Sequence, residues 1–264
     1  MTFQPPPLPR EHGAWAMLAI PLLVGLAASG RPASSSLLIL PATLLLFLAR
    51  YAALPAATRL AKGRNVPEGY VARRFVWSAV YLAGSAVFLL AAVTTAAPAA
   101  RWATVLMAVV TGVLGTVHAA LALVSRDRTL WCELIGLTGL ACSATLVMAA
   151  AGRPLDGKAW AVTGLCLGYF VTSVAYVRTY RTRDRGKTDA AAACIAVHVL
   201  VLAGWIALWQ QGWLPGLGLV AFVPVAMRTA WGLWRPPANV RAVGWTEMVV
   251  ATGFLVLAAL AVAS

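Results

Sequence analysis

The feature that most constrains this chain is a series of nine apolar runs that predict membrane-spanning helices. In hydrocarbon, only α-helices and closed β-barrels satisfy every backbone N–H and C=O, and these runs are too long and continuous for barrel strands. The sequence therefore predicts an all-α, polytopic membrane protein in which residues 1–264 form one transmembrane domain. The expected spans lie near residues 14–29, 35–60, 74–96, 102–125, 130–151, 158–180, 190–210, 214–233 and 245–263.

Composition excludes the soluble classes of protein. Hydrophobic residues make up 61% of the chain and charged residues 11%, with a mean hydropathy of +0.81. Soluble domains carry roughly 25% charged residues. The net charge of +13 could suggest nucleic acid, but the basic residues gather at the ends of the apolar runs and no nucleic-acid-binding motif is present. We therefore expect no nucleic-acid partner and expect contacts with membrane lipids, anionic ones above all.

The distribution of basic residues predicts the topology, because Lys and Arg collect on the cytoplasmic side of membrane proteins. With the N-terminus in the cytoplasm and the C-terminus outside, 17 of the 21 basic residues fall on the cytoplasmic side. This count assigns Arg228, near the end of the eighth run, to the cytoplasmic rim. The Pro-rich segment before Ala14 makes a poor signal peptide, so we expect it to be a cytosolic lead-in to the first helix.

An arginine-rich segment after the sixth run is the strongest candidate for a binding site. If the helix continues, Arg178, Arg181 and Arg185 lie at positions i, i+3 and i+7 and line one face. Guanidinium groups bind phosphates through paired hydrogen bonds, although arginines here could also only anchor the helix end. Tyr176 belongs to a neighbouring stripe of tyrosines that would either line a substrate cavity or, more commonly, pack against another helix.

A second basic group comes from the first half of the chain. Arg50 stands inside the second apolar run, where an unpaired cation is costly, and Arg74 opens the third. On the predicted topology both lie on the same side of the membrane as Arg178 and Arg181. We therefore predict that these four arginines share one anion-binding pocket that faces the cytosol.

Acidic residues lie on the same side, because Glu11, Glu133 and Glu247 each stand near the start of an odd-numbered run. A carboxylate there can favour the helix dipole, neutralise arginines or act as an acid–base group. Glu133 is the candidate acidic member of the substrate pocket. Glu11 and the adjacent His12 are the candidate catalytic residues.

Neither a metal nor a cofactor is expected. His118 and His198 stand alone in apolar runs, without a histidine or carboxylate at i+4, so we expect each to hydrogen-bond across helices. The four cysteines show no C-x-x-C spacing. They are expected to pack as small apolar residues rather than to bind zinc or form disulfides.

Two resemblances to known families follow from these residues. The run Glu11-His12-Gly13-Ala14-Trp15-Ala16-Met17-Leu18, followed by Pro21 and Gly25, resembles the hallmark of the YwiC-like family of bacterial membrane proteins. That resemblance implies a multi-pass protein of the bacterial cytoplasmic membrane and no particular activity.

The second resemblance, a more distant one, is to the UbiA superfamily of intramembrane prenyltransferases. The spacing of Trp15, Pro21 and Gly25 is similar to their first helix, and residues 181–188 are similar to the tail of their second aspartate-rich motif. This resemblance implies a helical bundle around a cytosol-facing cavity and an isoprenoid substrate. The chain departs from the family because arginine and tyrosine stand where magnesium-binding aspartates are needed, so ordinary magnesium-dependent transfer is not expected.

Three functional hypotheses remain. In the first, the chain binds or transforms an anionic isoprenoid or lipid phosphate on a UbiA-like scaffold; as an enzyme it would be a prenyltransferase-like transferase without the usual metal sites. In the second, it is a transporter or lipid-handling protein. In the third, it is a non-catalytic accessory or assembly protein whose polar residues are anchors and interhelical contacts.

Overall fold

A computed structural model describes residues 5–9, 12–124, 129–183, 189–235, 237 and 239–263. Within these ranges it contains ten α-helical segments and no β-strand. The segments are α1 (His12–Ala28), α2 (Ser34–Ala61), α3 (Glu68–Thr95), α4 (Pro98–Leu123), α5 (Leu130–Ala150), α6 (Gly157–Arg183), α7 (Asp189–Gln210), α8 (Gly216–Val220), α9 (Phe222–Trp234) and α10 (Val240–Ala263).

Eight spans among the described residues are long and apolar enough to cross a membrane, with α8 and α9 together forming one of them, Gly216–Trp234. The apolar part of α1, Gly13–Ala28, is shorter than these. The prediction of an all-α, polytopic membrane protein is therefore confirmed.

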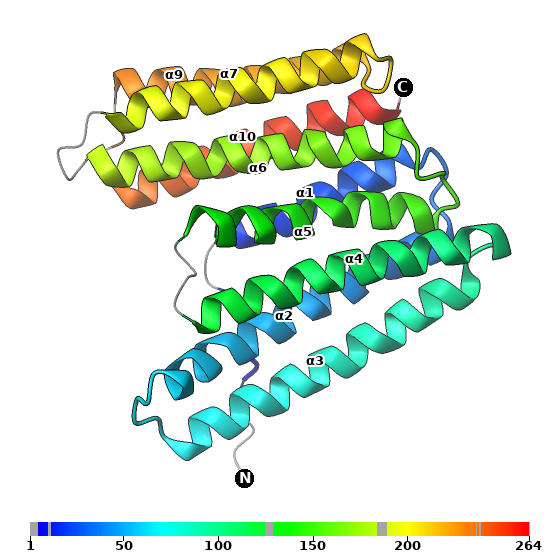
Figure 1. Ribbon diagram of the computed structural model, residues 1–264, viewed down its shortest axis with the longest axis vertical. Helices are drawn as coiled ribbons and strands as arrows, with labels where there is room; N and C mark the ends of the chain where they lie inside the picture. The colour runs from blue at the N-terminus through cyan, green and yellow to red at the C-terminus, as the bar shows by residue number, and fades with distance from the viewer. Residues whose placement is uncertain are drawn as a thin grey trace.

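The helices pack in two layers, as Figure 1 shows. The layer nearer the viewer contains α3, α4, α5, α6 and α7 in chain order, so that each helix runs antiparallel to the next, and the layer behind contains α2, α1, α10 and α9. Contacts of α5 with α1 and α2, and of α6 with α1 and α10, join the two layers. As a result, α1, α5 and α10 begin at the same end of the bundle at which α6 and α9 finish.

The centre of the bundle is formed by α5 and α6. Buried residues make up 72% of the most apolar window of α5 and 61% of that of α6, against 39% or less in every other described span. Outer helices instead expose large apolar side chains such as Leu90, Leu200 and Val249. In a bilayer these side chains face lipid tails, which are as apolar as leucine, so their exposure carries no hydrophobic penalty.

Small residues allow the closest helix contacts. A Cβ atom at Gly25 of α1 would lie 2.5 Å from the carbonyl oxygen of Ala144 on α5, a distance that no side chain tolerates. Ser35 of α2 donates a hydrogen bond of 2.6 Å to the carbonyl oxygen of Ala150 at the end of α5. These contacts hold α5 against both α1 and α2, in the manner typical of membrane helices.

The expected run 214–233 is divided in the structure. Helix α8 ends at Val220 and α9 begins at Phe222, with Ala221 between them. Pro224 explains the interruption, because it has no N–H to donate to the carbonyl of Val220 and its ring crowds that carbonyl.

Candidate functional site

A cavity of about 350 Å³ lies between α1, α5, α6 and α10, at the end of the bundle where α6 finishes. Most of its wall is apolar, with methionine, valine and alanine side chains from three of the helices, and its charged groups come from α5, α6 and α10. Its lining residues are Gly13, Ala16, Met17, Glu133, Tyr169, Ser173, Val174, Val177, Arg178, Arg181, Val243, Gly244, Glu247, Met248 and Ala251.

The mouth of the cavity carries an ion pair and a further arginine. The Nε atom of Arg178 lies 2.9 Å from Oε2 of Glu133, and the two side chains are 40% and 31% exposed. Solvent screens a pair of this exposure, which contributes at most about 1 kcal/mol to stability. Arg181, almost one turn further along α6, is exposed and also lines the cavity. Of the expected arginine face of α6, Arg178 and Arg181 both line the cavity, and Arg185 lies outside the described residues.

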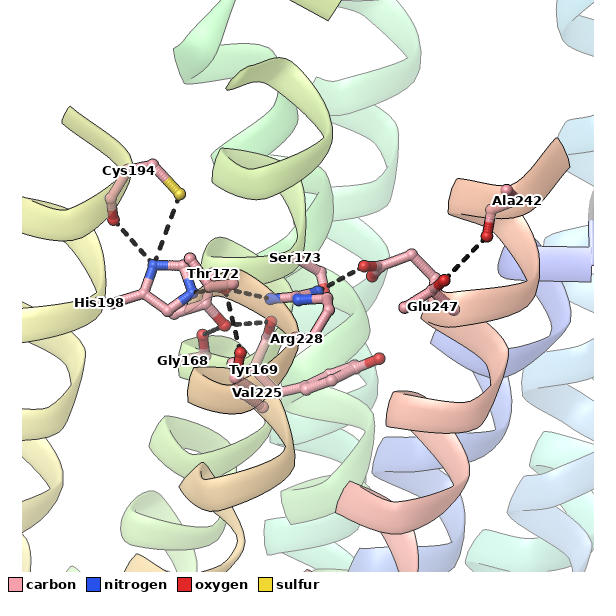
Figure 2. Close-up of polar contacts among 12 residues, drawn as sticks. Gly168, Tyr169, Thr172, Ser173, Cys194, His198, Val225, Arg228, Ala242 and Glu247 are labelled. Atoms are coloured by element: carbon pink, nitrogen blue, oxygen red, sulfur yellow. Dashed lines mark hydrogen bonds and ion pairs between the residues drawn. The ribbon is translucent and has the colours of Figure 1, made fainter. Parts of the chain in front are cut away.

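A more buried ion pair lies deeper in the bundle. Figure 2 shows Arg228 of α9 reaching Glu247 of α10, with Nη1 donating to Oε1 at 2.6 Å and to Oγ of Ser173 at 3.2 Å. The Arg228 side chain is fully buried, whereas that of Glu247 is 15% exposed and lines the cavity. The guanidinium carbon of Arg228 lies 4.6 Å from the centre of the Tyr176 ring. Glu247 thus separates a buried cation from the cavity.

Hydrogen bonds extend from this pair to α7. Nη2 of Arg228 donates to Oγ1 of Thr229 at 3.4 Å, and Oγ1 of Thr229 lies 2.8 Å from Nε2 of His198. The Nδ1 atom of His198 lies 2.8 Å from the carbonyl oxygen of Cys194. Because a carbonyl only accepts, Nδ1 carries the hydrogen. The Thr229 hydroxyl, which has one hydrogen, lies within hydrogen-bond distance of both Nε2 of His198 and the carbonyl oxygen of Val225, the latter at 3.0 Å. The predicted interhelical hydrogen bond of His198 is therefore confirmed.

Two of the expected pocket arginines lie elsewhere. Nη2 of Arg50 donates to Nε2 of His118 at 3.3 Å, across α2 and α4, which confirms the interhelical role expected for His118. Nη1 of Arg74 donates to the carbonyl oxygens of Tyr51 and Ala52 at 3.1 and 3.4 Å. Neither Arg50 nor Arg74 lines the cavity, so the structure does not bring them together with Arg178 and Arg181.

The remaining sequence candidates divide into three cases. Glu133 lies at the cavity mouth, as described above. Tyr176 is 3% exposed, does not line the cavity and packs beneath Arg228, with its hydroxyl against Gly232. Glu11 and the side chain of His12 lie outside the described residues, although the adjacent Gly13 lines the cavity.

No group of three or more His, Cys, Asp and Glu side chains that could hold a metal occurs in the part of the chain that the structure describes. All four cysteines are buried, as expected for small packing residues.

Sequence reasoning placed Arg228 incorrectly, on the cytoplasmic rim, because it was counted with the basic residues of a connector. The structure buries it inside the bundle, where Glu247 supplies the partner that a buried cation needs. A signal was present in the sequence. Arg228 and Glu247 stand at similar distances along the chain from the connector 235–239, and residues equidistant from a connector face each other in an antiparallel helix pair.

Comparison with known proteins agrees with the resemblance seen at the N-terminus. The model of the YwiC-like protein family matches residues 8–149, more than half of the chain. The chain belongs to the YwiC-like family. It is 29% identical over 249 residues to "Uncharacterized protein YwiC" of Bacillus subtilis (strain 168), an alignment that covers 94% of this chain and 95% of that relative. No solved structure matches the chain.

Proposed function

We propose that this YwiC-like chain binds an anionic amphiphile, an isoprenyl or lipid phosphate, in the cavity between α1, α5, α6 and α10. The observation that carries the proposal is the composition of that cavity, which combines apolar walls with two arginines at the mouth. Its volume of about 350 Å³ falls within the usual range for ligand pockets, roughly 300–1,000 Å³.

The walls suit the apolar part of such a ligand. Met17, Val174, Val177 and Met248 come from three helices and present flexible or branched apolar side chains to the cavity. Methionine adapts to irregular apolar shapes, which favours an unsaturated or branched chain. The free energy of binding comes mainly from contacts between the hydrocarbon chain of the ligand and these walls, whereas the few polar groups fix the orientation of the ligand.

The mouth suits the anionic headgroup. Arg181 forms no ion pair with a described residue, and its guanidinium group can donate two parallel hydrogen bonds to phosphate oxygens. Arg178 is already paired with Glu133 through Nε, which fixes its position beside Arg181. The two arginines together supply the charge and the geometry that phosphate recognition requires.

The proposal includes a location. We place the chain in the cytoplasmic membrane of a bacterium, with the N-terminus inside, so that the cavity mouth faces the cytosol. The alternation of basic residues supports this orientation, and the Bacillus subtilis relative supports the bacterial setting.

The proposal has a catalytic form, which rests on the likeness of Trp15, Pro21 and Gly25 to the first helix of UbiA enzymes. In this form Arg178 and Arg181 hold the phosphate without the usual magnesium sites, and Glu11 or His12 acts as the acid–base group. Gly13 lines the cavity, so the start of α1 would lie beside a ligand bound there, which supports this role.

Thermal stabilisation of the purified protein in mild detergent tests the binding proposal. The probes are farnesyl phosphate and farnesol, each with Mg²⁺ and with a chelator. We expect farnesyl phosphate to raise the Tm in chelator as well as in Mg²⁺, and Arg181→Gln to weaken its binding about tenfold, since a hydrogen bond to a charged group contributes about 1.5–3 kcal/mol. Equal stabilisation by farnesol and farnesyl phosphate would overturn the proposal.

Two arginine variants serve as controls for this experiment. Arg153→Gln removes an exposed cation at the opposite end of the bundle, and Arg50→Gln removes one outside the cavity. Neither should change the dissociation constant of farnesyl phosphate. A loss of binding in Arg50→Gln equal to that in Arg181→Gln would place the headgroup elsewhere.

Transport or lipid handling is the second candidate, and the buried Arg228–Glu247 pair favours it, because ionisable residues inside a membrane domain commonly mark a substrate path. Proteoliposomes containing the protein would then move a fluorescent lipid phosphate between leaflets, and Arg228→Gln would abolish the movement. Binding without movement favours the first candidate. Tolerance of substitution at Arg178, Arg181 and Glu133 would favour the accessory role.

A further inference from the structure

We infer that the cavity accepts a headgroup with one negative charge, and that Glu247 is the residue that sets this specificity. The inference rests on the proposed function, because it names the charge class of the ligand for the same cavity.

The charges around the cavity nearly cancel. Among its described lining residues, Arg178 and Arg181 are cationic and Glu133 and Glu247 are anionic. Arg228 lies directly behind Glu247 and adds one positive charge. The described groups therefore carry an excess of one positive charge, which a single negative charge on the ligand would neutralise.

Glu247 lies inside the cavity rather than at its mouth. It shares Nη1 of Arg228 with Ser173, so Glu247 and Ser173 lie at one level of the bundle. Ser173 precedes Arg181 by eight residues, about 12 Å along the axis of α6. An anionic group held by Arg181 at the mouth therefore lies farther from Glu247 than a second phosphate directed inwards, which approaches it.

The surroundings of Glu247 keep its carboxylate in place. Arg228 holds it at 2.6 Å, and Arg228 is itself held by Ser173, by Thr229 and by the face of the Tyr176 ring. A ligand therefore cannot displace Glu247 without breaking its ion pair with Arg228 and leaving that buried cation unpaired. Beside apolar walls the repulsion between like charges is poorly screened, so a fixed carboxylate discriminates strongly against additional negative charge.

These relationships define the chemical class of the ligand. A phosphodiester carries one negative charge and leaves the described site neutral. A phosphate monoester carries about 1.5–2 negative charges at pH 7, and a diphosphate carries more. We therefore expect a lipid or isoprenyl phosphodiester to bind more tightly than the corresponding monophosphate, and the diphosphate to bind least tightly.

The test measures dissociation constants in detergent, with chelator, for four probes that share one farnesyl chain: the alcohol, the methyl phosphodiester, the monophosphate and the diphosphate. In the wild-type protein the diphosphate should bind about tenfold or more weakly than the phosphodiester, as expected for juxtaposed like charges. Dimethyl phosphate, which has no chain, should bind at least about tenfold more weakly than the farnesyl phosphodiester, since it lacks the apolar contacts; equal affinities would show a site for free phosphate instead.

Glu247→Gln tests the assigned residue. It should strengthen binding of the diphosphate about tenfold and leave the phosphodiester within about threefold, because it removes one negative charge without removing the side chain. Asp156→Asn is the matched control, since it removes the same charge at the start of α6, at the opposite end of the bundle. The preference for the phosphodiester should be unchanged in this control.

Two results would overturn the inference. One is a wild-type diphosphate affinity equal to that of the phosphodiester, which needs no variant to observe. The other is a folded Glu247→Gln protein that binds all charged probes with the wild-type order and ratios. If no charged probe binds more tightly than farnesol, the proposed function itself fails; if charged probes bind without this order, only the inference fails.

Discussion

Arg228 and Glu247 form an ion pair of 2.6 Å between α9 and α10, and the guanidinium side chain is fully buried. The pair at the cavity mouth, Arg178 and Glu133, is 40% and 31% exposed. These two pairs have the same chemistry in different surroundings. Their contributions to stability should therefore differ, because removing one member of a buried pair leaves an uncompensated charge, whereas water compensates an exposed one.

The first prediction concerns the buried pair. Arg228→Leu should lower the free energy of unfolding by about 3–5 kcal/mol, since it leaves Glu247 without its cation. The double variant Arg228→Leu/Glu247→Leu should recover most of that loss, because no buried charge remains. The measurement is unfolding in mixed micelles with increasing SDS.

The corresponding cycle at the mouth provides the comparison. The single variants Arg178→Gln and Glu133→Gln and the double variant should each change the free energy of unfolding by less than about 1 kcal/mol.

At the buried pair, one outcome would contradict the first prediction. If Arg228→Leu/Glu247→Leu is as unstable as Arg228→Leu alone, the unpaired charge is not what destabilises the single variant.

The second prediction concerns the contact of α1 with α5. Gly25→Ala should destabilise the protein by about 1–3 kcal/mol, because the new Cβ would lie 2.5 Å from the carbonyl oxygen of Ala144 and the helices must separate. Gly204→Ala is the matched control, since nothing lies within 4 Å of a Cβ built there. Alanine exceeds glycine in helix propensity by about 1 kcal/mol, so Gly204→Ala should be neutral or stabilising. Equal stability of the two variants in SDS unfolding would contradict the close packing of α1 on α5.

The class of fold could be predicted from sequence because it follows from local information. Each apolar run had to satisfy its own backbone hydrogen bonds, which requires a helix whatever the neighbouring helices are. The interruption at Ala221 was missed, although Pro224 was visible, because prolines are tolerated inside membrane helices, as Pro41 and Pro55 are in α2. The two layers of helices depend on contacts between distant segments, which hydropathy does not contain.

The candidate site was predictable only in part, for the same reason. Arg178 and Arg181 share a face through helical periodicity, and both line the cavity. Arg50 lies at the same end of the bundle but contacts His118 instead. The sequence predicts on which side of the membrane a residue lies and how far into a span, but not which helices are neighbours. Arg228 was misplaced because an arginine near the end of an apolar run looks like a rim residue until its partner on α10 is known.

The third prediction concerns the hydrogen bonds between α7 and α9. Thr229→Val keeps the shape of the side chain but removes the hydroxyl that lies 2.8 Å from Nε2 of His198. We expect a loss of about 0.5–1.5 kcal/mol in the free energy of unfolding, the usual net contribution of such a bond. Thr229→Ser restores the hydroxyl and should restore most of the stability, whereas a Ser variant no more stable than the Val variant would assign the effect to packing.

The fourth prediction concerns the orientation in the membrane. With the N-terminus inside, Lys62, after α2, faces the cytosol and Arg153, after α5, faces the outside, and both are exposed. In intact cells a membrane-impermeant maleimide should label Arg153→Cys but not Lys62→Cys, and both should react after the membrane is permeabilised. The four native cysteines are buried, so they should add little background labelling. Labelling of Lys62→Cys alone in intact cells would reverse the orientation and place the cavity mouth outside, because α2 and α6 finish at the same end of the bundle. A ligand would then enter from the outer leaflet, while the contacts that arrange Arg181, Glu247 and Arg228 would be unchanged.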